Sequence, residues 1–209
     1  MEVLDRLNSM RLLEALTFGG GTMLRLCHGL DRYSVDLDFW LVDPLRAETL
    51  FAELKTHLAR FYTLRDTAFK HYSLLFELGS SSYPRSLKIE IRKDPGRPDT
   101  EPAIAYSPHS NRQVLLRAMT LNQMMILKTR ALLDRAEIRD AYDMEFIVKR
   151  GIPLPAGVDV PERLLQRINS FSKTDYSSKL GSLLEPEKRI YYREQNFRIL
   201  INAIHQRLS

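Results

Sequence analysis

The fold of this chain is decided by residues 17–39, which read TFGGGTMLRLCHGLDRYSVDLDF. We expect a strand over residues 34–42, in which Asp36 and Asp38 point to one face, about 7 Å apart along the backbone, while the apolar side chains beside them face the core. Two carboxylates in this arrangement repel each other unless a cation lies between them. Carboxylate oxygens are ligands of Mg²⁺, which also binds nucleotide phosphates. The spacing therefore predicts a Mg²⁺ site and indicates phosphoryl or nucleotidyl transfer.

A glycine triplet precedes the acidic strand, at the end of a short predicted strand and before a helix that Thr22 can cap. Gly20 and Gly21, together with Thr22, would let the backbone approach the phosphates of a nucleotide. Ser34 would add a hydroxyl donor near the same oxygens. Two roles are open for Arg25, which either contacts the phosphates or ties its helix to the acidic strand.

A third acidic residue is a candidate because residues 86–93 alternate polar and apolar side chains, as a half-buried strand does. If this strand lies beside the acidic strand, Glu90 supplies a third carboxylate, which activates the attacking hydroxyl or holds a second metal ion. The alternative is that Glu90 pairs with Lys88 or Arg92 on an exposed face of the sheet.

The order of the predicted elements divides the chain into two parts. Hydrophobic periodicity predicts helices over residues 2–15 and 45–60 and strands over residues 61–68, 70–78 and 86–93. A proline-rich loop with a short strand at 103–106 follows over residues 94–112, and the helical period then recurs over residues 112–118, 120–134, 137–149, 161–171 and 186–207. We therefore expect an α/β (α+β) fold in which a mixed sheet with flanking helices, residues 1–112, precedes a C-terminal helical bundle, residues 113–209.

The helical part contains a lysine on an apolar helix face, Lys128, whose neighbours one turn away include methionines and leucines. Such a lysine is costly to bury unless an anion meets it. On the following helix, Asp140 and Asp143 share a face, and Arg139 precedes Asp143 by four residues and is its expected salt-bridge partner. The alternative is that these charges form a solvated helix surface.

Charge and cysteine content restrict the partner and the compartment. The 209 residues include 31 Lys and Arg against 26 Asp and Glu, a net charge of +5, which fits either a polyanionic partner or simple solubility. Cys27 is the only cysteine, so no intramolecular disulfide forms, in agreement with a reducing cytosol. Because we find neither a signal peptide nor a long apolar run, we expect a cytoplasmic protein without membrane contact. The five histidines lack metal-ligand spacing and predict no zinc site.

The last predicted helix interleaves basic and aromatic side chains, which suits stacking on RNA and neutralising its phosphates. An apolar stripe on the same helix indicates that several of these residues pack in the core instead; its members are Ile190, Phe197, Ile201, Ile204 and Leu208.

Four blocks together resemble the AbiEii/AbiGii-type nucleotidyltransferase toxins, which are similar in core to the DNA polymerase β-like nucleotidyltransferases. The blocks are residues 20–26, 32–39, 128–135 and 139–143. The resemblance extends from about residue 16 to residue 147. It implies a Mg²⁺-dependent transfer of a nucleoside monophosphate from an NTP to an acceptor, which in related toxins can be the 3′ end of tRNA. It also implies either a type IV toxin, with an antitoxin encoded by a neighbouring gene, or a stand-alone relative of these toxins.

On this resemblance, Asp36 and Asp38 coordinate the Mg²⁺, and Lys128 supplies positive charge against the triphosphate. Asp143 orients Lys128 or the base and sugar of the nucleotide. Two other functions stay open: transfer to a small molecule or a protein hydroxyl, and a binding module that holds nucleotide or RNA without chemistry.

Overall fold

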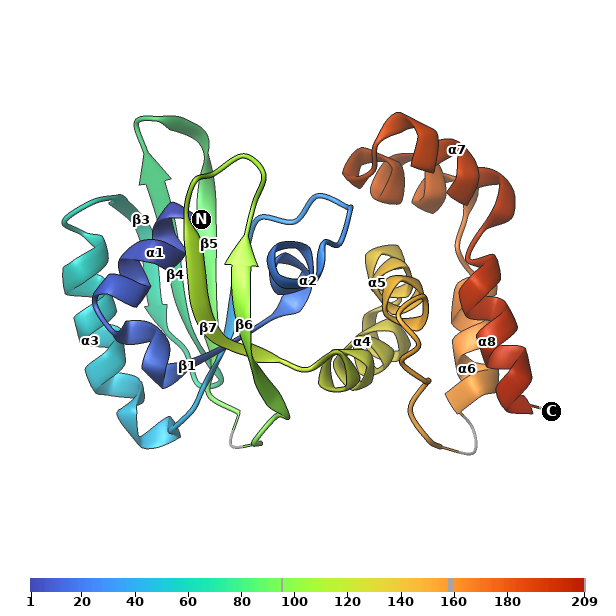
Figure 1. Ribbon diagram of the computed structural model, residues 1–209, viewed down its shortest axis with the longest axis horizontal. Helices are drawn as coiled ribbons and strands as arrows, with labels where there is room; N and C mark the ends of the chain where they lie inside the picture. The colour runs from blue at the N-terminus through green and yellow to red at the C-terminus, as the bar shows by residue number, and fades with distance from the viewer. Residues whose placement is uncertain (95, 158–159, 209) are drawn as a thin grey trace. The chain divides into compact units, whose positions relative to one another are not determined.

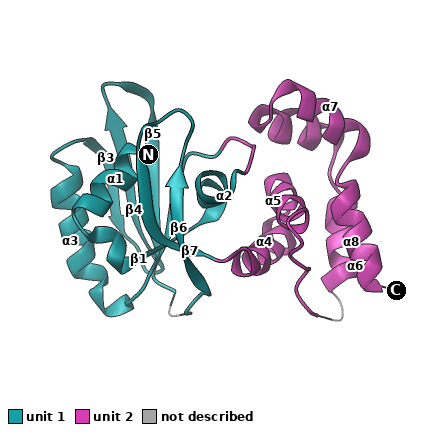
Figure 2. Ribbon diagram, in the orientation of Figure 1, with its two compact units in different colours: residues 1–29, 34–119 teal, residues 30–33, 120–209 magenta. Residues whose placement is uncertain are grey.

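The computed structural model describes residues 1–94, 96–157 and 160–208. The chain forms two compact units (Figures 1 and 2), a sheet unit of residues 1–29 and 34–119 and a helical unit of residues 30–33 and 120–209. The mixed sheet, its helices and the C-terminal helices confirm the predicted α/β (α+β) class. The functional division between residues 112 and 113 stays a prediction. Residue 95 of the predicted loop lies outside the described residues.

The sheet unit is built on one mixed sheet. Within the described residues it has seven strands: β1 (Leu16–Gly19), β2 (Leu37–Leu41), β3 (Thr63–Phe69), β4 (Ser73–Ser80), β5 (Tyr83–Arg92), β6 (Thr100–Tyr106) and β7 (Gln113–Met119). Their order in the sheet is β3-β4-β5-β2-β1-β7-β6. The pairs β2 with β5 and β1 with β7 are parallel, and the other neighbours are antiparallel. The two strands expected to carry carboxylates, β2 and β5, are therefore direct neighbours.

One face of the sheet forms the apolar core of this unit. Leu37 lies opposite Ile89, which lies opposite Phe76 on β4, and all three side chains are buried. Helix α3 (Ala47–Leu58) covers this face, and its Phe51 contacts Phe76 with ring centroids 5.1 Å apart (Figure 1). Phe39 is also fully buried, so the predicted inward direction of Leu37 and Phe39 is confirmed.

The predicted first helix is shorter than expected. Helix α1 (Glu2–Ser9) is followed by a separate 3₁₀ turn, η1 (Leu12–Ala15), because Arg11 adopts a left-handed backbone conformation with φ of 57°. Helix α2 (Gly20–His28) begins two residues before Thr22, so Thr22 is not its N-cap. A short 3₁₀ turn, η2 (Pro44–Arg46), precedes α3.

No described helix combines the length and apolar character that crossing a membrane requires.

Residues 113–119 form strand β7, and the helix that we predicted over 112–118 is wrong. Val114, Leu116 and Ala118 alternate inward, whereas Leu115 is 64% exposed. The exposed leucine interrupts the apolar and polar alternation by which a strand is recognised in a sequence.

The described part of the helical unit is built from helices and short helical turns. They are α4 (Leu121–Arg135), α5 (Ile138–Val148), α6 (Val160–Asn169), the π-helix η3 (Asp175–Leu180), the 3₁₀ turn η4 (Gly181–Leu183), α7 (Pro186–Gln195) and α8 (Arg198–Leu208). The Thr120 hydroxyl caps α4 by accepting from the Gln123 amide at 3.2 Å. Helix α8 packs against α5 and α6, as Figure 1 shows for α6.

The predicted single helix 186–207 is two helices, α7 and α8, separated at Asn196, whose φ of 51° cannot continue a helix. The break changes the predicted apolar stripe. Phe197 and Ile204 are fully buried, but Ile190 is 51% and Leu208 43% exposed. Core packing is therefore confirmed for only part of the stripe.

A buried carboxylate joins three helices of this unit. Glu145 of α5 is fully buried, and its oxygens accept from the Tyr192 hydroxyl of α7 at 2.8 Å and from the Leu200 amide of α8 at 3.1 Å. Lys149 lies 3.1 Å from the same carboxylate. Because buried polar groups are costly when unpaired, this carboxylate fixes the positions of α7 and α8 on α5.

We predict that Glu145→Ala lowers the free energy of unfolding by about 3 kcal/mol, because it leaves a buried hydroxyl and a buried amide without their acceptor. Urea denaturation followed by far-ultraviolet circular dichroism measures the change. Glu194→Ala, which removes an exposed glutamate from α7, is the control and should shift the transition by less than 0.5 kcal/mol, about the size of an ordinary surface substitution. Equal midpoints for the two variants would contradict this account of Glu145.

Candidate active site

Two of the predicted carboxylates are brought side by side by the pairing of β2 with β5. Asp38 lies directly opposite Glu90 in the parallel register. Both point away from the face that α3 covers, because their neighbours in each strand are buried there. Asp36 directly precedes β2, which begins at Leu37 rather than at residue 34 as we predicted. The sheet thus presents at least two carboxylates on one face, with Asp36 at the entrance to the strand.

The glycine turn contacts the carboxylate of Asp38. Gly19 pairs with Asp38 across β1 and β2, and Gly20 follows with φ of +76°. A Cβ atom at Gly20 would lie 2.3 Å from Oδ2 of Asp38, closer than any real contact. Only glycine combines this backbone conformation with this close approach. The turn therefore places the first residues of α2, including Gly21, next to the acidic strand.

Glu90 takes part in both of the arrangements that the sequence left open. It lies opposite Asp38, and its Oε2 also accepts from Lys88 Nζ at 2.9 Å. Burial raises the pKa of Glu90, but the Lys88 hydrogen bond and the charges of Lys88, Arg92 and Lys70 outweigh burial, so the pKa lies below its ordinary value. Glu90 is therefore an ionised carboxylate paired with a lysine. Its role as a third catalytic carboxylate stays a prediction.

The described residues contain no group of three or more His, Cys, Asp or Glu side chains placed to hold a metal ion together. The donors that fit Mg²⁺ best are the hard carboxylate oxygens of Asp36 and Asp38, because Mg²⁺ is commonly held by one or two protein carboxylates and completes its shell with water and phosphate. The metal assignment of this pair stays a prediction.

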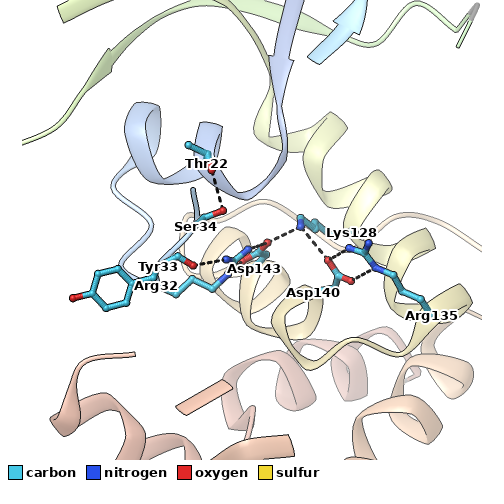
Figure 3. A network of polar contacts seen from close by, with 8 residues as sticks. All are labelled: Thr22, Arg32, Tyr33, Ser34, Lys128, Arg135, Asp140 and Asp143. Carbon is cyan, nitrogen blue, oxygen red and sulfur yellow. Dashed lines mark hydrogen bonds and ion pairs between the residues drawn. The ribbon is translucent and has the colours of Figure 1, made fainter. Parts of the chain in front are cut away.

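Three predicted nucleotide-binding residues are connected to one another. The Thr22 hydroxyl donates to Ser34 Oγ at 3.0 Å (Figure 3), and Arg25 Nη1 donates to the Ser34 carbonyl at 3.4 Å. Helix α2 is thus tied to the segment before β2, which is the second of the two roles that we left open for Arg25. Phosphate binding by these residues stays a prediction.

The same three residues line a cavity of about 550 Å³ in the sheet unit. Its other walls include Val35, Leu37 and Leu87, but not the carboxylates of Asp36, Asp38 or Glu90; the set of lining residues is mixed apolar and polar.

In the helical unit, Lys128 lies in a buried network of charges (Figure 3). Its Nζ is 3.0 Å from Asp140 Oδ1 and 2.6 Å from Asp143 Oδ2. Arg135 also binds Asp140, at 2.8 and 2.9 Å. The prediction that an anion meets Lys128 on its apolar face is confirmed, and both anions come from α5.

Arg32 completes this network, and the sequence analysis did not identify it. Its Nε and Nη2 donate to the two oxygens of Asp143 at 2.6 and 2.7 Å, and both side chains are almost fully buried. Arg32 and Lys128 are thus the partners of Asp143, where we had expected Arg139. Burial alone would raise the pKa of Asp143, but Lys128 and Arg32 hold it below its ordinary value.

The network has an excess of positive charge. Arg32, Lys128 and Arg135 carry three positive charges, and Asp140 and Asp143 carry two negative charges. Among these five side chains the positive charges therefore exceed the negative ones by one.

The whole segment 30–33 is held in the helical unit through contacts on both sides of Arg32. Asp31 accepts from the Tyr142 hydroxyl at 2.5 Å and pairs with Lys188. The Tyr33 amide donates to the Leu183 carbonyl at 2.8 Å, and the Tyr33 hydroxyl to Glu185 at 2.7 Å. These contacts explain why four residues between α2 and β2 belong to the helical unit (Figure 2).

Several solved structures share this fold. JHP933 from Helicobacter pylori is 19% identical, with 99% of this chain and 93% of that chain covered and a TM-score of 0.56. A putative nucleotidyltransferase from H. pylori is 17% identical, with 100% and 98% covered and a TM-score of 0.56. MenT4, a nucleotidyltransferase toxin from Mycobacterium tuberculosis, is 18% identical, with 98% and 92% covered and a TM-score of 0.53.

No curated protein matches the sequence of this chain. A family model does match, over residues 2–202, and it describes the nucleotidyl transferase AbiEii toxin of type IV toxin–antitoxin systems. The match covers nearly the whole chain and extends beyond the four blocks that carried the resemblance in the sequence. This protein therefore belongs to the AbiEii family of nucleotidyltransferase toxins.

Proposed function

We propose that this protein transfers a nucleoside monophosphate from an NTP to RNA, with the 3′ end of tRNA as the acceptor, and that it acts as a type IV toxin whose antitoxin is encoded by a neighbouring gene. The observation that supports chemistry on the sheet unit is the alignment of Asp38 with Glu90 beside the Gly20 turn. A catalytic site of this kind needs carboxylates that share one face of a sheet and a backbone that approaches them without side chains.

Asp36 and Asp38 hold the Mg²⁺ in this proposal, and Mg²⁺ when bound would screen the negative charge of the triphosphate. Because Gly20 and Gly21 have no side chains, their backbone can approach the phosphates in this proposal. Glu90, which is ionised, is the candidate acceptor for the proton of the attacking hydroxyl.

Lys128 supplies fixed positive charge for the triphosphate, and Asp143 orients Lys128. The proposal is supported by the contact that holds the ammonium of Lys128 in place, since its Nζ lies 2.6 Å from Asp143 Oδ2. Thr22, Arg25 and Ser34 bind the nucleotide in this proposal. Their hydrogen bonds to one another hold α2 and the segment before β2 in one arrangement, and this preorganisation favours binding.

RNA is the proposed acceptor because the net charge is +5 and helices α7 and α8 expose basic side chains to solvent: Arg189, Arg193 and Arg198. Exposed cations attract the phosphates of RNA without requiring a particular base sequence. A small-molecule acceptor, a protein acceptor and a non-catalytic binding module are the alternative outcomes of the first test below.

We predict that Asp36→Asn and Asp38→Asn each lower nucleotide transfer by about 100-fold or more, because an amide cannot replace a carboxylate as a charged ligand. Pure protein is incubated with Mg²⁺, each labelled NTP in turn, and total RNA, protein or small-molecule extract, and the label is followed. Label should appear in RNA. Asp66→Asn, which alters an exposed aspartate of β3, is the matched control and should retain transfer.

If the label appears in protein or in small molecules, that class of molecule is the acceptor and RNA is not. Full transfer by both Asp36→Asn and Asp38→Asn would show that the carboxylates have no catalytic role. Absence of transfer to every acceptor, together with unchanged cellular toxicity of Asp36→Ala, would favour the binding module.

We also predict that Lys128→Met and Arg32→Met differ in their effects. Without Lys128, Asp143 keeps Arg32 and Asp140 keeps Arg135, so the fold survives while transfer falls by about 100-fold. Without Arg32, the buried Asp143 keeps only Lys128, so the free energy of unfolding falls by about 3 kcal/mol.

Transfer assays and urea denaturation of both variants measure these effects. A Lys128→Met variant that is destabilised as strongly as Arg32→Met would show that Lys128 is a structural residue, and one that is fully active would remove it from the catalytic mechanism.

A further inference from the structure

Charged side chains of both signs lie on the carboxylate face of β2 and β5. Asp38 pairs with Glu90 in the parallel register, and Leu37 pairs with Ile89. Asp36 directly precedes Leu37, and Lys88 directly precedes Ile89. Because side chains alternate along a strand, Lys88 and Glu90 share one face of β5, and this is the face that Asp38 occupies on β2.

The ammonium of Lys88 is in direct contact with one of these carboxylates, that of Glu90. Its Nζ donates to Glu90 Oε2 at 2.9 Å. This hydrogen bond raises the pKa of Lys88, against the lowering effect of burial, and the charges of Asp36 and Asp38 raise it further. All three carboxylates therefore stabilise one positive charge on Lys88.

This contact offsets a repulsion that the register creates. Like charges directly opposite each other on neighbouring strands destabilise a sheet, and Asp38 and Glu90 are such a pair. A divalent cation would offset the same repulsion. The ammonium of Lys88 and a bound metal ion would thus neutralise the same carboxylates. Two cations close to the same carboxylates repel each other.

We propose that Lys88 is a positioning residue that acts as an internal counter-cation: it pairs with Glu90 when no metal ion is bound, and it must withdraw from Glu90 when a divalent cation binds to the carboxylates. This inference rests on the proposed function, which assigns the cation to Asp36 and Asp38.

The side chain of Lys88 is suited to such a movement. It is 45% exposed, whereas that of Glu90 is 28% exposed, so the ammonium can enter water without crossing a packed core. A lysine has a flexible four-carbon stem and a single compact charge, and it therefore loses and regains an ion pair more readily than an arginine held at two points. The contrast within this chain is Arg32, which binds Asp143 through two hydrogen bonds in a buried site.

The pairing of Glu90 with Lys88 also bears on the number of carboxylates that a metal ion can reach. Within the described residues, no three acidic, histidine or cysteine side chains are gathered as a metal-binding group. Because an oxygen of Glu90 is engaged by Lys88, Glu90 becomes available as a third carboxylate only after Lys88 leaves. Lys88 would in this way lower the affinity for the metal ion and keep the two strands together without it.

The test is the affinity of the whole protein for Mn²⁺, measured without NTP by the electron paramagnetic resonance signal of free Mn²⁺. Lys88→Gln should bind Mn²⁺ about tenfold more tightly than the unsubstituted protein, because a competing charge is gone. Lys88→Arg keeps the charge and should bind Mn²⁺ more weakly than Lys88→Gln. Lys55→Gln changes an exposed lysine of α3 and should leave the affinity unchanged.

A second measurement is thermal unfolding with and without Mn²⁺. Mn²⁺ should raise the melting temperature of Lys88→Gln more than that of the unsubstituted protein, because at a given concentration a ligand that binds the folded state more tightly stabilises it more. Lys88→Gln without Mn²⁺ should melt at a lower temperature than the unsubstituted protein, because the opposed carboxylates of Asp38 and Glu90 then lose the positive charge of Lys88.

The outcomes separate the inference from the proposed function. If the unsubstituted protein binds Mn²⁺, if Asp38→Asn abolishes this binding, and if Lys88→Gln binds no more tightly, the inference about Lys88 is overturned and the proposed metal site stands. If neither the unsubstituted protein nor Lys88→Gln binds Mn²⁺, the metal assignment fails and the inference fails with it. If only Lys88→Gln binds, the competition is supported.

Discussion

The parallel pairing of β2 with β5 is the constraint on which the candidate site depends. It sets Asp38 opposite Glu90 on one face while Leu37 and Ile89 close the core on the other. A slip of β2 by one residue against β5 would turn Asp38 into the core and Leu37 outward. The burial of the apolar face under α3 therefore also fixes the carboxylate face. Hydrophobic packing on one side of these strands therefore determines the direction of the carboxylates on the other side, on which the catalytic proposal depends.

The helical unit uses charge differently. In the sheet unit, Lys88 and Glu90 are partly exposed, and their interaction is of the kind that solvent and salt weaken. In the helical unit, Arg32 and Asp143 are almost fully buried and bound at two points. A buried charge is costly without a partner, and the two hydrogen bonds from Arg32 hold Asp143 in one arrangement. The two units thus differ in the exposure of their charged side chains. Lys88 in the sheet unit is partly exposed and can move, whereas the ion network of the helical unit is buried and fixed.

The sequence was sufficient to predict elements and faces whose signals are local. The strand with Asp38, the glycine turn and the apolar surroundings of Lys128 all depend on residues within a few positions of one another, and the structure contains each of them. The pairing of Glu90 with the acidic strand was open in the sequence, because neighbouring strands in a sheet need not be neighbours in the chain.

The rest could not be predicted because it depends on contacts between distant residues. Arg32 and Asp143 are 111 positions apart, and no spacing rule connects an arginine in a loop with an aspartate on a helix. Strand β7 was missed because Leu115 is exposed, which only the completed sheet shows. The family match over residues 2–202 supplies the reaction class, while the metal ion and the acceptor remain proposals.

The central claim, that the acids of the early strand hold a divalent cation, is tested most directly by a crystal structure grown with Mn²⁺ and a non-hydrolysable NTP analogue, with anomalous scattering used to locate manganese. The account predicts an anomalous peak that places manganese within bonding distance of carboxylate oxygens of Asp36 and Asp38 and of the triphosphate. Manganese bound elsewhere, with the analogue distant from both aspartates, would contradict it.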